Sequence, residues 1–119
     1  MEKAVYLSLL LDFYGELLTE KQREYAELYY NENLSLSEIA ENDGISRQAV
    51  RDALLRAEAV LRDTEEKTGL LARHRKLLLE IEGAEALLLR MEALNAASLH
   101  SPELLSLCAQ LQERLDAMK

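Results

Sequence analysis

Residues 34–55 read LSLSEIAENDGISRQAVRDALL and carry the signals of two short helices joined by a tight turn. Ser35 is a helix-capping residue type, and Glu38, three positions later, completes a capping box. Gly44 can adopt the positive φ that a steep turn between two helices requires. Ser46 can then cap the second helix. The stretch therefore predicts a helix-turn-helix unit.

The apolar residues of this unit have the spacing of two helices that touch. Five of them fall on the expected contact faces: Ile39, Ala40, Ile45, Val50 and Ala53. We expect the first helix to end near Asn42. Ala40 is small enough to let the two helices approach closely. A charge placed at Val50 should unfold the unit, because it would be buried in this contact.

The second helix of the unit carries the residue types that contact nucleic acid. Arginine can bond guanine at two atoms and glutamine can do the same with adenine, and helix-turn-helix proteins present such side chains from this helix. Residues 46–62 contain four arginines and two acidic residues, a net charge of +2. The alternative is a solvated helix face, and Asp52 would repel phosphate. The candidate nucleic-acid-binding residues, expected on the outer face, are Ser46, Arg47, Gln48, Arg51 and Arg56.

The charge of the whole chain argues against simple binding to DNA. The chain has 14 basic and 22 acidic residues, a net charge of −8, whereas DNA-binding domains are usually basic. The first 69 residues contain 8 basic and 15 acidic residues, and the rest contains 6 and 7. Such a protein would need a dimer, a specific RNA or a protein partner to bind nucleic acid well.

Composition and periodicity predict an all-α protein. Leu, Ala and Glu are abundant, with one Pro and four Gly. Residues 4–18 predict a helix that is buried from two directions, because they form two apolar stripes. The stripes are Leu7, Leu11, Tyr14 and Leu18, and Tyr6, Leu10, Phe13 and Leu17.

A second capping box, at Thr19 and Gln22, predicts a helix that continues to about Tyr30. Tyr25, Leu28 and Tyr29 lie on one face of it, and a place in the core is favoured for Tyr25 and Leu28, because a spacing of three and four residues is typical of packing. Stacking of these rings on RNA bases is the less favoured alternative. Tyr30 lies off that face and is the better candidate for a contact with a partner.

The helix that begins at Ser46 is expected to continue to Lys67, with Asp63, Glu65 and Glu66 in a solvated charged end, and to stop at Gly69. This glycine is the predicted boundary between two domains. Residues 1–68 are expected to form the helix-turn-helix domain, and residues 69–119 a C-terminal antiparallel helical hairpin.

The predicted hairpin has an apolar stripe on each of its helices. The first helix shows heptad-like spacing, with Leu70, Leu77, Ala84 and Met91 in one register and Ile81 and Leu88 in the other. Residues 95–101 are expected to connect the helices, and Ser101 before Pro102 predicts the next helix start. The last stripe is Leu104, Cys108, Leu111, Leu115 and Met118. Because the hairpin and the first helix have more apolar surface than a small monomer can cover, we expect a homodimer.

The residues indicate no catalytic or metal-binding site. His74 and His100 are far apart and there is a single cysteine, Cys108, so neither a zinc site nor a Cys-His pair is supported. Cys108 lies on an apolar stripe and is expected in the core. We expect no enzymatic activity and no cofactor. Residues 5–11 are the longest apolar run, and no secretory signal is present, so we expect a cytoplasmic protein without membrane contact.

Five short motifs lie within residues 12–58: DFY at 12–14, LT-x-KQ at 18–22, LYY at 28–30, SL-x-EIAE at 35–41 and SRQAV at 46–50. Through these motifs, residues 18–58 resemble the small YlxM-like proteins of Gram-positive bacteria, which are associated with the signal recognition particle. More distantly, it is similar to the fourth region of bacterial RNA polymerase sigma factors. After the last matching motif the family usually has an aromatic residue and, two places on, an asparagine, where this chain has Arg51 and Ala53.

The resemblance implies an accessory or regulatory protein of the signal recognition particle pathway, in contact with the particle's RNA, its GTPase or both. Two other interpretations stay open at the level of the sequence. One is a DNA-binding transcriptional regulator. The other is an adaptor for proteins that keeps the helix-turn-helix only as a scaffold.

Overall fold

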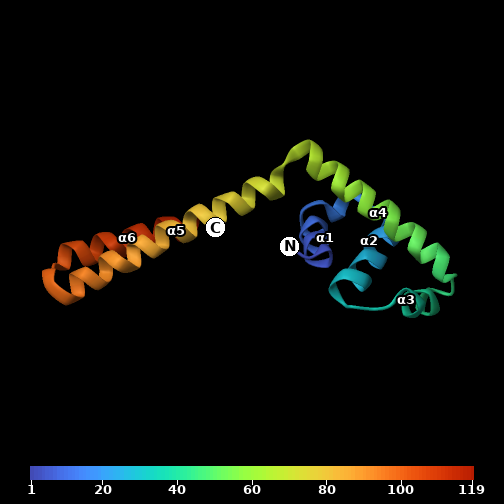
Figure 1. Cartoon of the computed structure of the whole chain (residues 1–119), viewed down its shortest axis with the longest axis horizontal. Coiled ribbons are helices and arrows are strands. Elements are labelled where there is room, and N and C mark those ends of the chain that lie inside the picture. The colour runs from blue at the N-terminus through green and yellow to red at the C-terminus, as the bar shows by residue number, and fades with distance from the viewer. The chain divides into compact units, whose positions relative to one another are not determined.

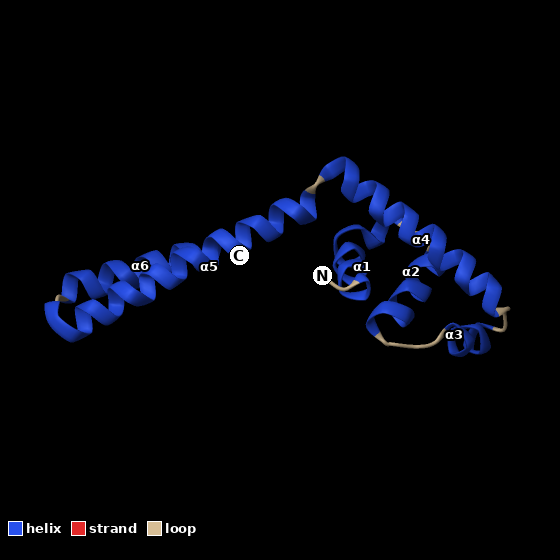
Figure 2. Cartoon of the chain, in the orientation of Figure 1, coloured by secondary structure: helices blue, strands red, loops and turns tan.

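The computed structural model describes the whole chain, residues 1–119, as helices joined by short turns (Figures 1 and 2). The six helices and the absence of strands confirm the all-α prediction. No helix combines the length and the apolar character needed to cross a membrane. The chain divides into two compact units, residues 1–71 and 72–119. The helices are α1 (Lys3–Tyr14), α2 (Glu20–Ala26), α3 (Leu36–Asp43), α4 (Arg47–Thr68), α5 (Leu70–Leu94) and α6 (Pro102–Ala117), with a 3-10 turn at Gly15–Leu17 and π-helical turns at Glu27–Asn31 and Asn95–Leu99.

The predicted capping interactions of the first unit are present. The backbone N–H of Glu38 donates to the Ser35 hydroxyl, and the N–H of Ser35 donates to the Glu38 carboxylate, both at 3.1 Å. The same reciprocal bonds join Thr19 and Gln22. Gly44 ends α3 with a φ of 67°, which is strained for any residue with a Cβ. These local interactions confirm the predicted starts of α2 and α3 and the turn before α4.

The core of the first unit lies where α1, α2 and α3 pack against α4. The stripe from α4 consists of Val50, Leu54, Ala57 and Leu61. The expected contact between the two helices of the helix-turn-helix is confirmed at Ile39, Ala40 and Val50. Ile45 is an exception, since it is 38% exposed. It lies in the turn between the helices, where helical spacing does not determine the direction of a side chain.

The expectation that the first helix runs to Leu18 is wrong, and its second apolar stripe is covered only in part, since Leu10 is buried and Tyr6 packs against the core but Phe13 is exposed. Helix α1 ends at Tyr14, and Leu17 is 62% exposed. The chain passes from α1 into a 3-10 turn, which has three residues per turn instead of 3.6. The spacing used for the prediction therefore stops applying after Tyr14.

The two adjacent tyrosines after α2 have exchanged their expected positions. Tyr29 is exposed, whereas Tyr30 packs against the core cluster. The helix changes from α to π geometry at Glu27, and each π-type bond spans one more residue than an α-type bond. This extra residue rotates the later side chains relative to a regular α-helix.

Glu65 was expected in a solvated helix end but is buried, with 9% of its surface exposed. The Tyr14 hydroxyl donates to its carboxylate at 2.6 Å, and the backbone N–H of Leu71 donates to the same oxygen at 3.0 Å. Gly69 ends α4 with a φ of 63° and lets the chain turn back toward this carboxylate. Glu65 therefore satisfies an N–H in the first turn of α5, which has no partner within that helix.

The second unit is an antiparallel hairpin of α5 and α6 with a small core (Figure 1). Its buried residues are Ile81, Leu88, Cys108 and Leu115. The burial of Cys108 confirms its predicted place in the core. Of the other register, Ala84 packs against this core, whereas Leu70, Leu77 and Met91 are exposed in the single chain. Within the unit, α5 has one neighbouring helix, and only the stripe that faces α6 is covered.

Asn95 is buried and closes the turn of the hairpin. Its side-chain amide donates to the backbone oxygen of Ser101 at 2.9 Å, and the N–H of Ser101 donates back to the Asn95 side chain at 2.7 Å. Residues 95–99 continue α5 as a π-helical turn, where a polar connection was expected. The Ser101 hydroxyl then accepts from the N–H of Leu104 at 3.1 Å, which confirms the predicted start of the last helix.

Candidate nucleic-acid interface

The predicted binding residues lie at the start of α4, the second helix of the helix-turn-helix. The Ser46 hydroxyl caps this helix by accepting from the N–H of Ala49 at 3.1 Å. Arg47, Gln48 and Arg51 follow in its first turns, and all three are exposed. Residues at positions i, i+1 and i+4 leave a helix on the same side. The structure therefore brings these three side chains together on one solvent-facing side of α4.

Arg56 does not join this group. Its side chain is exposed, but it lies nine residues after Arg47, which is about two and a half turns of an α-helix. It therefore leaves α4 on the side opposite Arg47, in line with Gln48 and Asp52, which precede it by eight and four residues. A ligand that contacts Arg47 and Arg51 would have to wrap around the helix to reach it.

The basic side chains of α4 differ in whether other residues neutralise them. Arg62 pairs with Glu58, and Lys67 pairs with Asp63, each at 3.0 Å. The remaining three have no ion pair within the chain. An anionic ligand would meet unpaired guanidinium groups at Arg47, Arg51 and Arg56.

Asp52 limits the positive potential at this side of α4. The amide of Gln48 donates to the Asp52 carboxylate at 3.0 Å, which holds a negative group beside the exposed arginines. A carboxylate repels phosphate but accepts hydrogen bonds from amino groups such as that of cytosine. The surface therefore favours a ligand whose phosphate contacts the arginines and whose hydrogen-bond donor contacts the Asp52 carboxylate.

A groove of about 380 Å³ beside Arg51 extends the candidate interface beyond α4. The rings of Tyr29 and Tyr30 meet edge to face there, with centroids 5.1 Å apart. The sequence did not single out Lys3 or Leu55 for this site, because the groove combines side chains from segments that are distant along the chain. The lining residues are Lys3, Ala4, Tyr29, Tyr30, Leu36, Arg51, Leu54, Leu55 and Glu58.

Besides its cations, Lys3 and Arg51, this groove is lined by the carboxylate residue Glu58 and by Tyr30. The Glu58 carboxylate is mostly buried and lies 3.4 Å from the ammonium of Lys3 and 3.0 Å from the guanidinium of Arg62. Burial, followed by the charge of Glu58, raises the pKa of Tyr30 to about 12. The phenol therefore stays protonated at neutral pH. The groove thus offers an exposed aromatic ring, a cation and hydrogen-bonding groups to a flat ligand.

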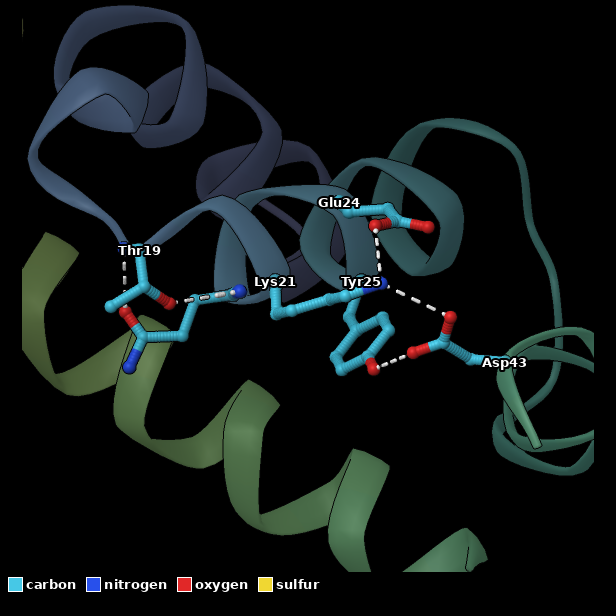
Figure 3. Close-up of polar contacts among 6 residues, drawn as sticks. Thr19, Lys21, Glu24, Tyr25 and Asp43 are labelled. Carbon is cyan, nitrogen blue, oxygen red and sulfur yellow. Dashed lines mark hydrogen bonds and ion pairs between the residues drawn. The ribbon is translucent and has the colours of Figure 1, made fainter. Parts of the chain in front are cut away.

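Asp43, the last residue of α3, connects the first helix of the helix-turn-helix to α2 (Figure 3). Its carboxylate accepts from the Tyr25 hydroxyl and lies 3.1 Å from the Lys21 ammonium, which also bonds Glu24 at 3.3 Å. The bond from Tyr25, followed by that from Lys21, lowers the pKa of Asp43 below its ordinary value. The same bond is the main reason why the pKa of Tyr25 is raised. These contacts hold α3 in the orientation from which the turn leads into α4.

We expect acid to weaken this connection. A carboxyl with a lowered pKa in the folded state stabilises the fold above its unfolded pKa of 3.8 and loses that contribution as the pH falls through the folded value. Asp43→Asn should lower the free energy of unfolding at neutral pH and reduce its decline between about pH 5 and pH 2. Denaturant titrations at several pH values measure both effects.

Glu24→Gln is the matched control for this prediction, because Glu24 bonds the same lysine but is an exposed partner. Exposed ion pairs contribute little, so this variant should behave almost like the parent. If Asp43→Asn had the stability and the pH dependence of the parent, the contact would not stabilise α3.

The fold and the arrangement at α4 define an all-α helix-turn-helix protein. A family described as "Putative helix-turn-helix protein, YlxM / p13 like", or UPF0122, matches residues 1–94. The chain belongs to this family, which confirms the resemblance inferred from the motifs. The matched residues include the whole helix-turn-helix unit and all of α5.

Named relatives support this assignment. A UPF0122 protein of Symbiobacterium thermophilum is 49% identical over 88 residues, which cover 73% of this chain and 82% of the relative. A UPF0122 protein of Caldanaerobacter subterraneus subsp. tengcongensis is 53% identical over 78 residues, 66% of this chain and 67% of the relative. One from Clostridium kluyveri is 55% identical over 71 residues, 60% of this chain and 64% of the relative.

Proposed function

We propose that this protein is a nucleic-acid-binding accessory or regulatory factor of the signal recognition particle pathway, in contact with the particle's RNA, its GTPase or both. The observation that carries the proposal is the pair of unpaired, exposed guanidinium groups of Arg47 and Arg51 at the start of α4, on a body with a net charge of −8. The resemblance to YlxM-like proteins supplies the pathway.

A folded RNA suits this surface better than bare duplex DNA. The acidic body disfavours binding driven by phosphate alone, since that mode needs many cations. The groove beside Arg51 contains the exposed ring of Tyr29, and aromatic rings stack on unpaired bases, which RNA loops and bulges present. We propose that Arg51 contacts a phosphate while a base enters the groove.

We further propose that the protein acts in the cytoplasm as a homodimer, turns over no substrate and uses no cofactor. Membership of a helix-turn-helix family supports a role in binding rather than in catalysis. A dimer would present two copies of the surface around Arg47 and Arg51. Two weak contacts on one molecule bind more tightly than either does alone, which offsets the unfavourable net charge.

Arg47→Ala and Arg51→Ala should each weaken binding to the particle's RNA by about tenfold, because each removes one charged contact. The slope of the logarithm of the binding constant against that of the salt concentration should fall by about one for each lost phosphate contact. Titrations of labelled RNA at several salt concentrations measure both values. Circular dichroism should show unchanged folding, because both side chains are exposed.

Two further variants control for the loss of charge. Lys67→Ala removes one positive charge from the far end of the same helix and should leave affinity close to that of the parent. Arg56→Ala tests the opposite side of α4, where a smaller loss is expected. If Arg47→Ala and Arg51→Ala bound as tightly as the parent, this side of α4 would not be the contact.

The alternative function is a DNA-binding transcriptional regulator, which the helix-turn-helix itself favours. Capture of the tagged protein from the cytosol of its native host distinguishes the two. We expect the RNA or the GTPase of the particle to be enriched over promoter DNA. Enrichment of particular promoter fragments, with neither component of the particle, would replace our proposal with the regulator.

A further inference from the structure

The seam between α5 and α6 has a polar side. The Glu85 carboxylate accepts from the Gln112 amide at 2.7 Å and from the Lys119 ammonium at 2.9 Å. Asp116 also bonds both of these donors, at 3.0 Å and 3.2 Å. These four side chains close one side of the hairpin with hydrogen bonds and ion pairs.

The other side of the seam is apolar. Met91 lies three residues after the buried Leu88, while Glu85 lies three residues before it, so the two flank Leu88 on opposite sides of α5. Leu111 and Gln112 flank the buried Cys108 in the same way on α6. Because Glu85 and Gln112 meet on the polar side, Met91 and Leu111 share the other. We define the apolar face as Leu87, Met91, Leu94, Leu107, Leu111 and Met118, which are 41–63% exposed.

The apolar face is large compared with the core that supports it. The hairpin core has four buried apolar side chains, whereas six large side chains are exposed on this one face. They present on the order of 500 Å² of apolar surface, against about 800 Å² that each partner contributes to a standard interface. The charged side chains at the edges of the face would add to this area. The face is therefore large enough for the centre of a stable dimer.

The charges at the edges of the apolar face are complementary to those of a second copy. Glu80 on α5 and Arg114 on α6 lie near the open end of the hairpin, and Arg90 on α5 and Glu103 on α6 lie nearer its turn. All four are exposed, and none has an ion pair within the chain. If α5 packs on the α6 of a second copy at the same level, each of these charges meets one of opposite sign.

We propose that the apolar face binds a second copy of this chain and that the two hairpins form a four-helix bundle. In this bundle α5 of one copy packs antiparallel to α6 of the other, so every neighbouring pair of helices is antiparallel, as is typical of such bundles. The Glu80 carboxylates then pair with the Arg114 guanidinium groups across the interface. The inference rests on the proposed homodimer but not on nucleic-acid binding, and its test uses the protein alone.

The first test replaces two residues of the apolar face in the full chain. Light scattering at about 50 µM, a concentration at which a dimer of micromolar Kd is populated, should give twice the chain mass of 13.5 kDa for the parent. The double variant Leu87→Glu with Leu111→Glu should raise the dimer Kd by at least about 100-fold, because it buries four charges per dimer. The hairpin should keep its helical circular dichroism, since both residues are exposed in a single copy.

The matched control is Leu79→Glu with Leu89→Glu. Both leucines belong to α5 and are at least as exposed as those of the apolar face, but they lie outside it. This variant should remain a dimer. A monomeric parent would overturn both the bundle and the proposed homodimer while leaving the nucleic-acid proposal intact. A dimer that survives Leu87→Glu with Leu111→Glu would overturn the bundle alone.

The second test concerns the pairing of the helices. Glu80→Arg and Arg114→Glu should each raise the dimer Kd by about three- to tenfold, because each places like charges together. The two substitutions combined restore opposite charges and should return the Kd to within about twofold of the parent. Additive weakening in the combined variant would overturn the proposed pairing of α5 with the α6 of the second copy.

Discussion

Val50→Asp is expected to unfold the first unit. Val50 is 0% exposed and belongs to the core cluster where α3 and α4 meet. A carboxyl group at this position would lose its water and find no donor, so the expected loss is about 4 kcal/mol or more. The whole stability of a unit of this size is about 4–10 kcal/mol. The substitution therefore removes a large part of it or all of it.

Tyrosine signals report this effect selectively, because all five tyrosines lie within residues 1–71. The near-ultraviolet circular dichroism spectrum of Val50→Asp should lack the tyrosine bands. If the variant still folds, the thermal midpoint of its unfolding should be far below that of the parent. Ala49→Asp is the matched control. Ala49 is exposed in the first turn of α4, where the helix dipole favours a negative charge. A parent-like midpoint in Val50→Asp would mean that this contact does not hold the unit together.

Glu65→Ala should cost about 2–4 kcal/mol, because hydrogen bonds to a charged group contribute about 1.5–3 kcal/mol and a buried donor is left without a partner. The N–H of Leu71 loses its acceptor, while the Tyr14 hydroxyl keeps its contact with Thr68. Urea denaturation measures the loss. The neighbouring Glu66 is exposed and carries the same charge, so Glu66→Ala should change stability by less than about 0.5 kcal/mol.

The hydrogen bond between Tyr14 and Glu65 also predicts that the stability of the fold decreases at alkaline pH. Burial, followed by the hydrogen bond to Glu65, raises the pKa of Tyr14 above its ordinary value of 10.0. The contribution of the phenol is therefore fully present below pH 10.0 and is lost as the pH rises through the folded value. Tyr14→Phe should be less stable than the parent at neutral pH and should show a smaller alkaline decline. If the stability of Tyr14→Phe declined at alkaline pH as much as that of the parent, the decline would be assigned to Tyr25 and Tyr30, whose pKa values are also raised.

Features that depend on neighbours a few residues away could be predicted from the amino-acid sequence. The capping boxes at Ser35 and Thr19, the cap at Ser46 and the turns at Gly44 and Gly69 all have the predicted form. Each of them depends on a hydrogen bond within about one turn or on the φ preference of one residue. The buried spacing of α4 was also predictable, because a regular helix keeps its period over its whole length.

Which side chains are buried, among those with similar neighbours in sequence, depends on contacts with distant parts of the chain. Glu65 belongs to a charged helix end by its neighbours in sequence, yet Tyr14 and the N–H of Leu71 surround it. Tyr29 and Tyr30 exchange places because a π-helical turn shifts their direction, and the groove beside Arg51 appears only where four segments converge. Burial depends on what packs against a helix from elsewhere in the chain, and helical period alone carries no information about that neighbour.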